Sequence, residues 1–240
     1  MIGKQKRTRA FLQGAAMAIT ATLIMSGVAI AADDDALPQA TPEGLKLSKQ
    51  TKHRVVYLAD DVDFSAYNKV LIVDCAVAFA KNWQRDYNRS ERDLSRQVRD
   101  NDVTRIKEGL AAEFRKVFTQ TMTDNGIEVV TEPASDVVIL RPAIVNLVVN
   151  APDLNSPGMT RTYTSDAGQM TLYLELYDSV SGAMLAKVMD AQGAGRTSPM
   201  MSYSSRATNI QAADRVLRGW ATELAGHFGA ATETDETAED

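Results

Sequence analysis

Cysteine and histidine are scarce in this chain: Cys75 is the only cysteine, and His53 and His227 are the only histidines. A single cysteine excludes an internal disulfide, and these three side chains do not supply the ligand spacing of a zinc site. A Ser-His-Asp triad would have to use one of the two histidines, and the sequence lacks the G-x-S-x-G elbow of acyl-transfer hydrolases. We therefore expect no catalytic residues. An uncharacterised hydrolase stays open as the least favoured alternative.

Motifs for phosphate and calcium are missing as well. No glycine-rich phosphate cradle precedes a helix, so no nucleotide cofactor is expected. Asp60, Asp61 and Asp63 stand close together, but they lack the glycine turn and the closing glutamate of a calcium loop. A solvated turn is the preferred interpretation of these three residues, and we expect neither a metal nor a cofactor.

The first 31 residues have the order of a secretory signal. Four basic residues precede an apolar run from Phe11 to Ile30, and Ala29-Ile30-Ala31 supplies the small-x-small pattern that signal peptidase needs. We expect cleavage between Ala31 and Ala32, and export to the periplasm of a Gram-negative cell envelope. The alternative is an uncleaved membrane anchor, since about 20 apolar residues can span a bilayer.

The cleavage region has no cysteine to carry a lipid, so the mature protein is expected to be soluble, either free in the periplasm or peripheral to the outer membrane. In an oxidising compartment an exposed single thiol would invite intermolecular bonding, and Cys75 is therefore expected to be buried. The alternation of Leu71, Val73, Cys75, Val77 and Phe79 predicts that Cys75 is a small core residue of a strand.

Acidic residues concentrate at the two ends of the mature chain. Loss of the four basic residues of the leader takes the net charge from −5 to −9. Asp33 to Asp35 and the last ten residues hold most of this charge, so we expect a disordered linker over 32–52, a single domain over 53–230 and a disordered acidic tail over 231–240. Nucleic-acid binding is not expected, because phosphate backbones need a basic surface.

Hydrophobic periodicity predicts the elements of the domain. Residues 54–58 form a short strand, and the continuous apolar run 69–80 predicts a central strand buried on both faces. A helix from Asp100–Asp102 to Asn125-Gly126, strands over 127–130 and 136–150, a hairpin over 169–192 and a helix opened by a capping box at Thr208 follow. Pro142 places part of its strand at an edge or bulge.

This order predicts an α/β (α+β) fold with two layers. We expect a mixed sheet of about five or six strands, two long helices packed on it, and a possible short amphipathic helix. A helical crossover joins the central strand to its parallel neighbour.

Arginines recur at helical spacing between residues 82 and 100. At about 100° per residue one helical face collects them, opposite Trp83, Tyr87, Leu94 and Val98; the set is Arg85, Arg89, Arg92, Arg96 and Arg99. The guanidinium fork grips phosphate or carboxylate, so this face is a candidate site for an anionic envelope component such as a glycan or a lipid head group. The alternative is a solvated face balanced by neighbouring acids.

Tyrosines mark a second candidate surface. Tyr173 and Tyr177 alternate with core residues on the predicted hairpin, Tyr163 lies in a long predicted loop over 151–168, and Tyr203 follows the hairpin in the sequence. Together they form a candidate recognition surface for an envelope protein. The alternative is ordinary cross-strand packing.

Tyr57, the run Asp63-Phe64-Ser65, Tyr67 and the "YDSVSG" turn starting at Tyr177 resemble an exported bacterial family, domain of unknown function 3313. The resemblance covers roughly residues 45–230. Many members of that family look like lipoproteins, and it has no established activity from which catalytic residues could be carried over.

The chain has a secretory leader and lacks a recognisable set of catalytic residues. We therefore expect a non-catalytic periplasmic binding or assembly module that contacts an envelope partner. An anion-, glycan- or lipid-head-group-binding protein that uses the arginine helix is the alternative.

Overall fold

The computed structural model describes residues 37–150, 152, 154, 162–164, 166–195, 202–204 and 206–229. The chain divides between Leu37 and Pro38, and the elements below belong to the second part. The leader with Ala31 and Ala32, the tail 231–240 and most of the loop 151–168 lie outside the described residues. In chain order the elements are β1 (Lys46–Gln50), β2 (Arg54–Leu58), η1 (Phe64–Ala66), β3 (Lys69–Ile72), β4 (Ala76–Phe79), α1 (Trp83–Ser90), η2 (Leu94–Arg96), α2 (Asp100–Asp124), β5 (Glu128–Val129), β6 (Val137–Val149), β7 (Thr162–Thr164), β8 (Asp166–Asp178), β9 (Met184–Gly195), β10 (Ser202–Ser204) and α3 (Arg206–Gly229).

A mixed sheet carries the fold, as predicted. Among the described residues it has eight strands in the order β1-β2-β9-β8-β6-β3-β5, with β4 also paired to β6. The pairs of β3 with β5 and of β3 and β4 with β6 are parallel, and the other pairs are antiparallel. The chain passes through α2 on its way from β3 to β5 and β6, which is the expected helical crossover.

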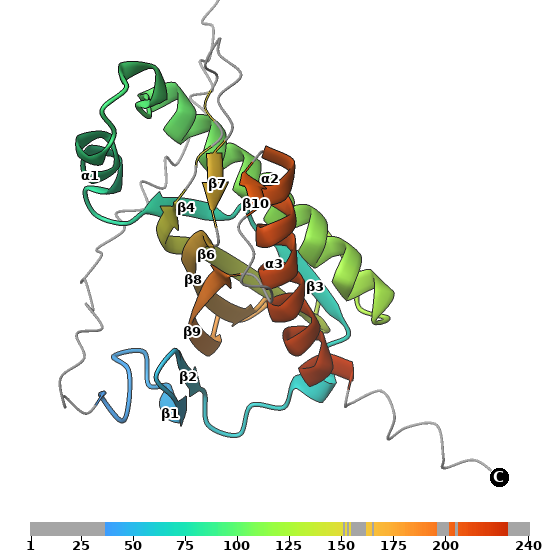
Figure 1. The fold of residues 1–240 in the computed structure, drawn as a ribbon. Helices are drawn as coiled ribbons and strands as arrows, with labels where there is room; N and C mark the ends of the chain where they lie inside the picture. The colour runs from blue at the N-terminus through green and yellow to red at the C-terminus, as the bar shows by residue number, and fades with distance from the viewer. Residues whose placement is uncertain are drawn as a thin grey trace, which may run out of the picture. The chain divides into compact units, whose positions relative to one another are not determined.

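The long helices α2 and α3 pack against each other and cross one face of this sheet (Figure 1). Phe114 and Phe118 of α2 stack with ring centroids 3.9 Å apart and are fully buried. Leu172, Leu174 and Leu176 of β8 meet the helices from the sheet, as the alternation of the hairpin predicted. Among the described residues, no helix combines the length and hydropathy needed to cross a bilayer.

The predicted strand 69–80 is broken, which is one reason why the sheet has more strands than expected. Leu140 of β6 accepts a hydrogen bond from Val73 N, and the pairing resumes at Ala76 opposite Ala143. Along a strand, the backbone groups of residues i and i+2 point to the same neighbouring strand. The carbonyl of Leu140 points to the segment between β3 and β4, so the backbone nitrogen of Pro142, which carries no hydrogen, points to the break in that segment. Pro142 therefore lies inside a central strand, opposite a gap, and not at an edge.

Cys75 lies in the break and packs against the core, but it is not one of the fully buried residues of the core. Val70 and Ile72 fill the core from this segment, whereas Cys75 is only half-buried. Burial still raises the pKa of its thiol to about 12, so the thiol is protonated at neutral pH.

The start of the domain was also mispredicted. The interval 32–52, expected to be a linker, contains strand β1, and Leu45 just before it is 1% exposed. Tyr57 Oη donates to the carbonyl of Pro38 at 3.0 Å and ties this segment to β2. β1 is an edge strand with mostly exposed side chains, so it lacks the apolar alternation by which strands are recognised.

Two further boundaries differ from the prediction. The interval 151–168 contains β7 and the first residues of β8, and β7 pairs with β10 in a separate two-stranded ladder. The helix α3 begins at Arg206, before the predicted cap at Thr208. The end of α2 is as predicted, with Gly126 in the left-handed region at φ 78°.

Candidate functional site

A cavity of about 320 Å³ lies between α3 and the strands β2, β8 and β9. Apolar side chains form most of its wall; among them are Val56, Leu58, Leu174, Val188, Leu224 and Phe228. Ser48, Lys49, Glu223 and His227 also line it and are exposed, so the cavity opens to solvent along β1 and the last turns of α3.

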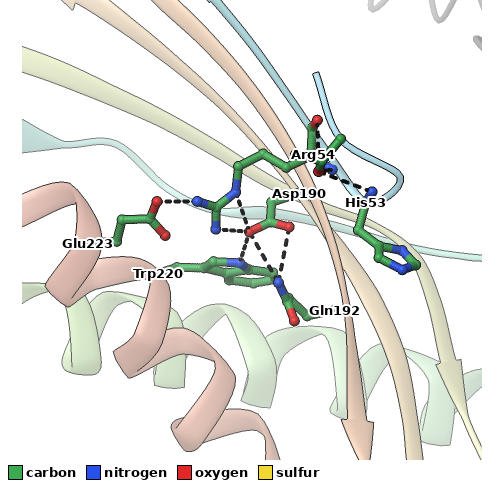
Figure 2. A network of polar contacts seen from close by, with 7 residues as sticks. His53, Arg54, Asp190, Gln192, Trp220 and Glu223 are labelled. Atoms are coloured by element: carbon green, nitrogen blue, oxygen red, sulfur yellow. Dashed lines mark hydrogen bonds and ion pairs between the residues drawn. The ribbon is translucent and has the colours of Figure 1, made fainter. Parts of the chain in front are cut away.

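A buried carboxylate, Asp190 of β9, lines this cavity. Figure 2 shows the network of polar contacts around it. Asp190 is 1% exposed, and its carboxylate oxygens accept hydrogen bonds from three side chains. Arg54 Nε donates to Oδ2 at 3.0 Å, Trp220 Nε1 donates to Oδ2 at 3.0 Å, and Gln192 Nε2 donates to Oδ1 at 3.1 Å. The acceptor capacity of Asp190 is therefore used within the protein.

Arg54 joins Asp190 to helix α3. Its Nη2 pairs with Asp190, and its Nη1 pairs with Glu223 of α3. Burial opposes the charge of Arg54, but its hydrogen bonds to Glu223 and Asp190 prevail and raise the pKa of Arg54. The strands β2 and β9 and the helix α3 are thus held around the cavity by charge-assisted bonds.

The lining of this cavity combines a mostly apolar wall with a few charged side chains. Ligand pockets typically measure about 300–1,000 Å³, and a few placed polar groups orient the ligand in an otherwise apolar wall. Among the described residues, no group of three or more histidine, cysteine or acidic side chains is arranged to hold a metal ion. Asp60 instead pairs with Lys46 at 2.8 Å, and Asp63 accepts from Ser65 N at 2.8 Å in a turn.

The arginines predicted to share one helical face do not do so. The helix α1 ends at Ser90, and Arg92, Arg96 and Arg99 lie outside it. The amide of Asn88 binds the backbone of Val98, at 2.7 Å to N and 2.9 Å to O, which folds the following segment back along α1.

Further local contacts replace the predicted long helix. Asp93 caps the short turn η2 by accepting from Ser95 N at 2.9 Å, and Leu94 is 75% exposed where the helix would have buried it. Arg85, Arg89, Arg92 and Arg99 are nevertheless exposed. Anion binding by these residues stays a prediction.

The tyrosines of β8 lie on the sheet face opposite the helices. Tyr173 Oη donates to Glu175 Oε1 at 2.7 Å, and Tyr177 Oη donates to Glu175 Oε2 at 2.8 Å. Burial, together with the bond to Glu175, raises the pKa of both phenols. Tyr163 is in register with Tyr203 between β7 and β10, and both side chains lie outside the described residues.

The described hydrogen bonds of His53 are made by its backbone. The N–H of His53 donates to Thr51 Oγ1 at 3.4 Å, and its carbonyl accepts from Ala191 N at 2.8 Å. His227 is exposed at the open end of the cavity.

Some of the residues that carried the family resemblance have structural roles in η1 and in the hairpin turn. Tyr67 Oη donates to Asp178 Oδ2 at 3.0 Å, and Asp178 also accepts from Ser181 N in the hairpin turn. Phe64 lines the cavity and meets Phe228 edge to face, with ring centroids 5.7 Å apart. These contacts connect η1, the hairpin and the end of α3.

A family model described as "Protein of unknown function (DUF3313)" matches residues 40–224. The chain belongs to the DUF3313 family. The match confirms the resemblance drawn from Tyr57, the segment 63–67 and the hairpin turn. It spans the network residues Arg54, Asp190 and Glu223 as well. No significant match was found among curated proteins.

Solved structures give weaker likenesses to this DUF3313 protein. A PelC dodecamer from Paraburkholderia phytofirmans has a TM-score of 0.34 at 11% identity, covering 70% of this chain and 96% of that chain. A minor lipoprotein from Acinetobacter baumannii has a TM-score of 0.32 at 10% identity, covering 69% and 95%. A Xanthomonas campestris protein matching the model DUF330 has a TM-score of 0.37 at 14% identity, covering 72% and 89%. These TM-scores are too low to transfer a function or an assembly.

The network residues were missed in the sequence, although one signal was present. Asp190 pairs with Leu172 across the hairpin and therefore falls on the core face, where an unpaired charge would be costly. A carboxylate at a core position of an alternating strand indicates a buried partner. The partner Arg54 is 136 residues away in sequence, and no local pattern identifies it.

Proposed function

We propose that this protein is an exported, non-catalytic binding protein of the bacterial cell envelope that takes the apolar part of a small amphiphile into the cavity beneath α3. The observation that carries the proposal is the apolar cavity of about 320 Å³ with an ordered ion network at one end. Since a cavity of ~150 Å³ holds benzene, this cavity has room for about twelve heavy atoms. The location rests on the secretory order of the first 31 residues.

The pairing of the charged groups supports a binding role over a catalytic one. Arg54 and Asp190 hold each other, so neither is free to act as a general acid or base. Such a pair instead fixes the elements that surround the cavity.

Binding is tested with 1-aminonaphthalene, a neutral apolar fluorophore of eleven heavy atoms whose emission shifts to shorter wavelength in an apolar site. The wild-type protein is expected to give saturable binding at one site. Val188→Phe, which fills the cavity from β9, is expected to weaken this binding at least tenfold. Val180→Phe is the matched control, because Val180 lies exposed in the hairpin turn and lines no part of the cavity.

Two results would contradict the proposal. One is the lack of saturable binding to the wild-type protein. The other is equal binding by the Val188→Phe and Val180→Phe proteins when both show the far-UV circular dichroism of the wild type. The envelope location is tested separately by the intact mass of the protein recovered from the periplasm, which should begin at Ala32.

A second candidate is recognition of an anionic envelope component or an acidic envelope protein by the segment around α1. The observation that favours it is the exposure of Arg85, Arg89, Arg92 and Arg99 within fifteen residues. Pairing weakens this surface, because Arg85 binds Asp86 at 3.1 Å and Arg96 lies 3.9 Å from Glu91.

A further inference from the structure

The polar groups beside the cavity differ in how firmly each is held. Asp190 is buried and accepts hydrogen bonds from Arg54, Trp220 and Gln192. A ligand that displaced any of these donors would leave a buried carboxylate short of partners, which is costly. Asp190 is therefore a fixed support and not a contact for a ligand.

The guanidinium of Arg54 pairs with two carboxylates that differ in exposure. Nε and Nη2 face Asp190, while Nη1 meets Glu223. The side chain of Arg54 is only 19% exposed, whereas that of Glu223 is 45% exposed. Glu223 is therefore the more exposed member of the pair, and another anion can take its place at Nη1 at small cost because water then solvates the released carboxylate.

Lys49 adds a second positive charge at the open end of the cavity. It lines the cavity from β1 and is exposed. An anion placed at Nη1 of Arg54 gains a donor that Asp190 already holds in position, so little conformational entropy is lost on binding. A cationic group would instead have to lie beside the like charges of Arg54 and Lys49, which repel it.

We infer that the ligand is a single-chain amphiphile with a small anionic head group, a carboxylate or a phosphate monoester, which displaces Glu223 from Arg54 while its chain fills the cavity. This inference rests on the proposed function. Glu223 acts as an internal competitor of the head group, and Lys49 of β1 adds a second positive charge.

The test is displacement of 1-aminonaphthalene by four ten-carbon probes at low salt, each below its critical micelle concentration or solubility limit. The probes are decanoate, decyl phosphate, decanol and decyltrimethylammonium. Both anionic probes are expected to bind at least tenfold more tightly than decanol, and the cationic probe more weakly than decanol. The two anionic probes distinguish a carboxylate from a phosphate as the preferred head group.

Two conservative variants of exposed residues sharpen the test, because neither should impair folding. Glu223→Gln removes the competitor and is expected to tighten binding of the anionic probes by about two- to fivefold. Lys49→Gln is expected to weaken it by a similar factor. Neither change should alter the binding of decanol, and Glu108→Gln, an exposed carboxylate of α2 that lines no part of this cavity, should alter nothing.

The outcomes separate this inference from the function on which it rests. Equal binding of decanoate and decanol in every variant would overturn the head-group inference and leave the proposed function standing. Tightest binding of the cationic probe, with loss in Glu223→Gln, would overturn it in favour of a cation at Glu223. Failure of all four probes to bind would overturn both.

Discussion

The two faces of the β8–β9 hairpin each carry a buried carboxylate, and the comparison shows how similar chemistry can serve different purposes. Asp190 faces the helices and is 1% exposed; Glu175 faces the other side and is 8% exposed. Each accepts from aromatic donors, Trp220 in one case and Tyr173 and Tyr177 in the other. Each also lies near a cation, Arg54 or Lys187.

The difference lies in what surrounds each carboxylate. Asp190 borders a cavity of about 320 Å³, and its arginine extends to an exposed partner, Glu223. Lys187 lies 4.0 Å from Glu175 and 3.3 Å from Glu43 of the segment before β1. Glu175 therefore helps to fasten the N-terminal segment to the sheet, whereas Asp190 and Arg54 border a cavity that opens to solvent.

The largest expected difference between the surroundings of Asp190 and those of Glu175 comes from replacing the cation beside each carboxylate. Arg54→Met leaves Asp190 buried without its charged partner and is expected to lower the free energy of unfolding by about 3–5 kcal/mol. Lys187→Met should cost about 1 kcal/mol, because Glu175 keeps two hydroxyl donors and Arg141 at 3.5 Å. Urea unfolding monitored by circular dichroism measures both, and equal losses would contradict the distinction.

A smaller effect is expected from the hydroxyls of the Glu175 cluster. Tyr173→Phe removes one donor to Glu175 and should cost about 1–2 kcal/mol at pH 7. The pKa of Tyr173 is raised in the folded state by burial and by Glu175, so the folded protein keeps a proton that the unfolded chain loses near pH 10.

The stabilisation linked to that proton is complete below about pH 10 and is lost as the pH rises further. The free energy of unfolding of the wild type should therefore fall above pH 10 more steeply than that of Tyr173→Phe. Urea titrations between about pH 9 and pH 11 test this, and parallel slopes would show that Tyr173 does not contribute.

The smallest effect on stability is expected in the arginine segment. Replacing Arg89, Arg92 and Arg96 with glutamine should change the free energy of unfolding by less than about 0.5 kcal/mol, because these side chains are exposed or only partly buried. The same triple variant should lose salt-sensitive binding to vesicles that contain anionic lipid. Unchanged vesicle binding would remove these arginines as a site.

The elements that could be predicted from the sequence are those in which buried side chains recur at the spacing of a strand or a helix. The hairpin, α2 and the mixed sheet with its helical crossover follow from such repeats, as Leu172, Leu174, Leu176, Phe114 and Phe118 illustrate. These side chains contact a common core, so the local pattern and the tertiary structure agree.

Features set by contacts between distant residues were not predictable in this way. The break in the arginine helix depends on Asn88 binding Val98, and the break after β3 faces Pro142 on another strand. The site itself joins Arg54, Asp190 and Glu223 from three elements far apart in the chain. Only the charge of Asp190 at a core position gave a local indication of it.

The most direct measurement of the central claim uses the two tryptophans of the chain, Trp83 and Trp220. Trp220 lines the cavity and donates its indole N–H to Asp190, whereas Trp83 stacks on Phe79 with ring centroids 4.1 Å apart. In ¹H–¹⁵N spectra recorded during titration with decanoate, the indole resonance of Trp220 should shift saturably while that of Trp83 stays in place. A Trp220 resonance that does not move, or equal shifts of both indoles, would contradict a ligand in the cavity beneath α3.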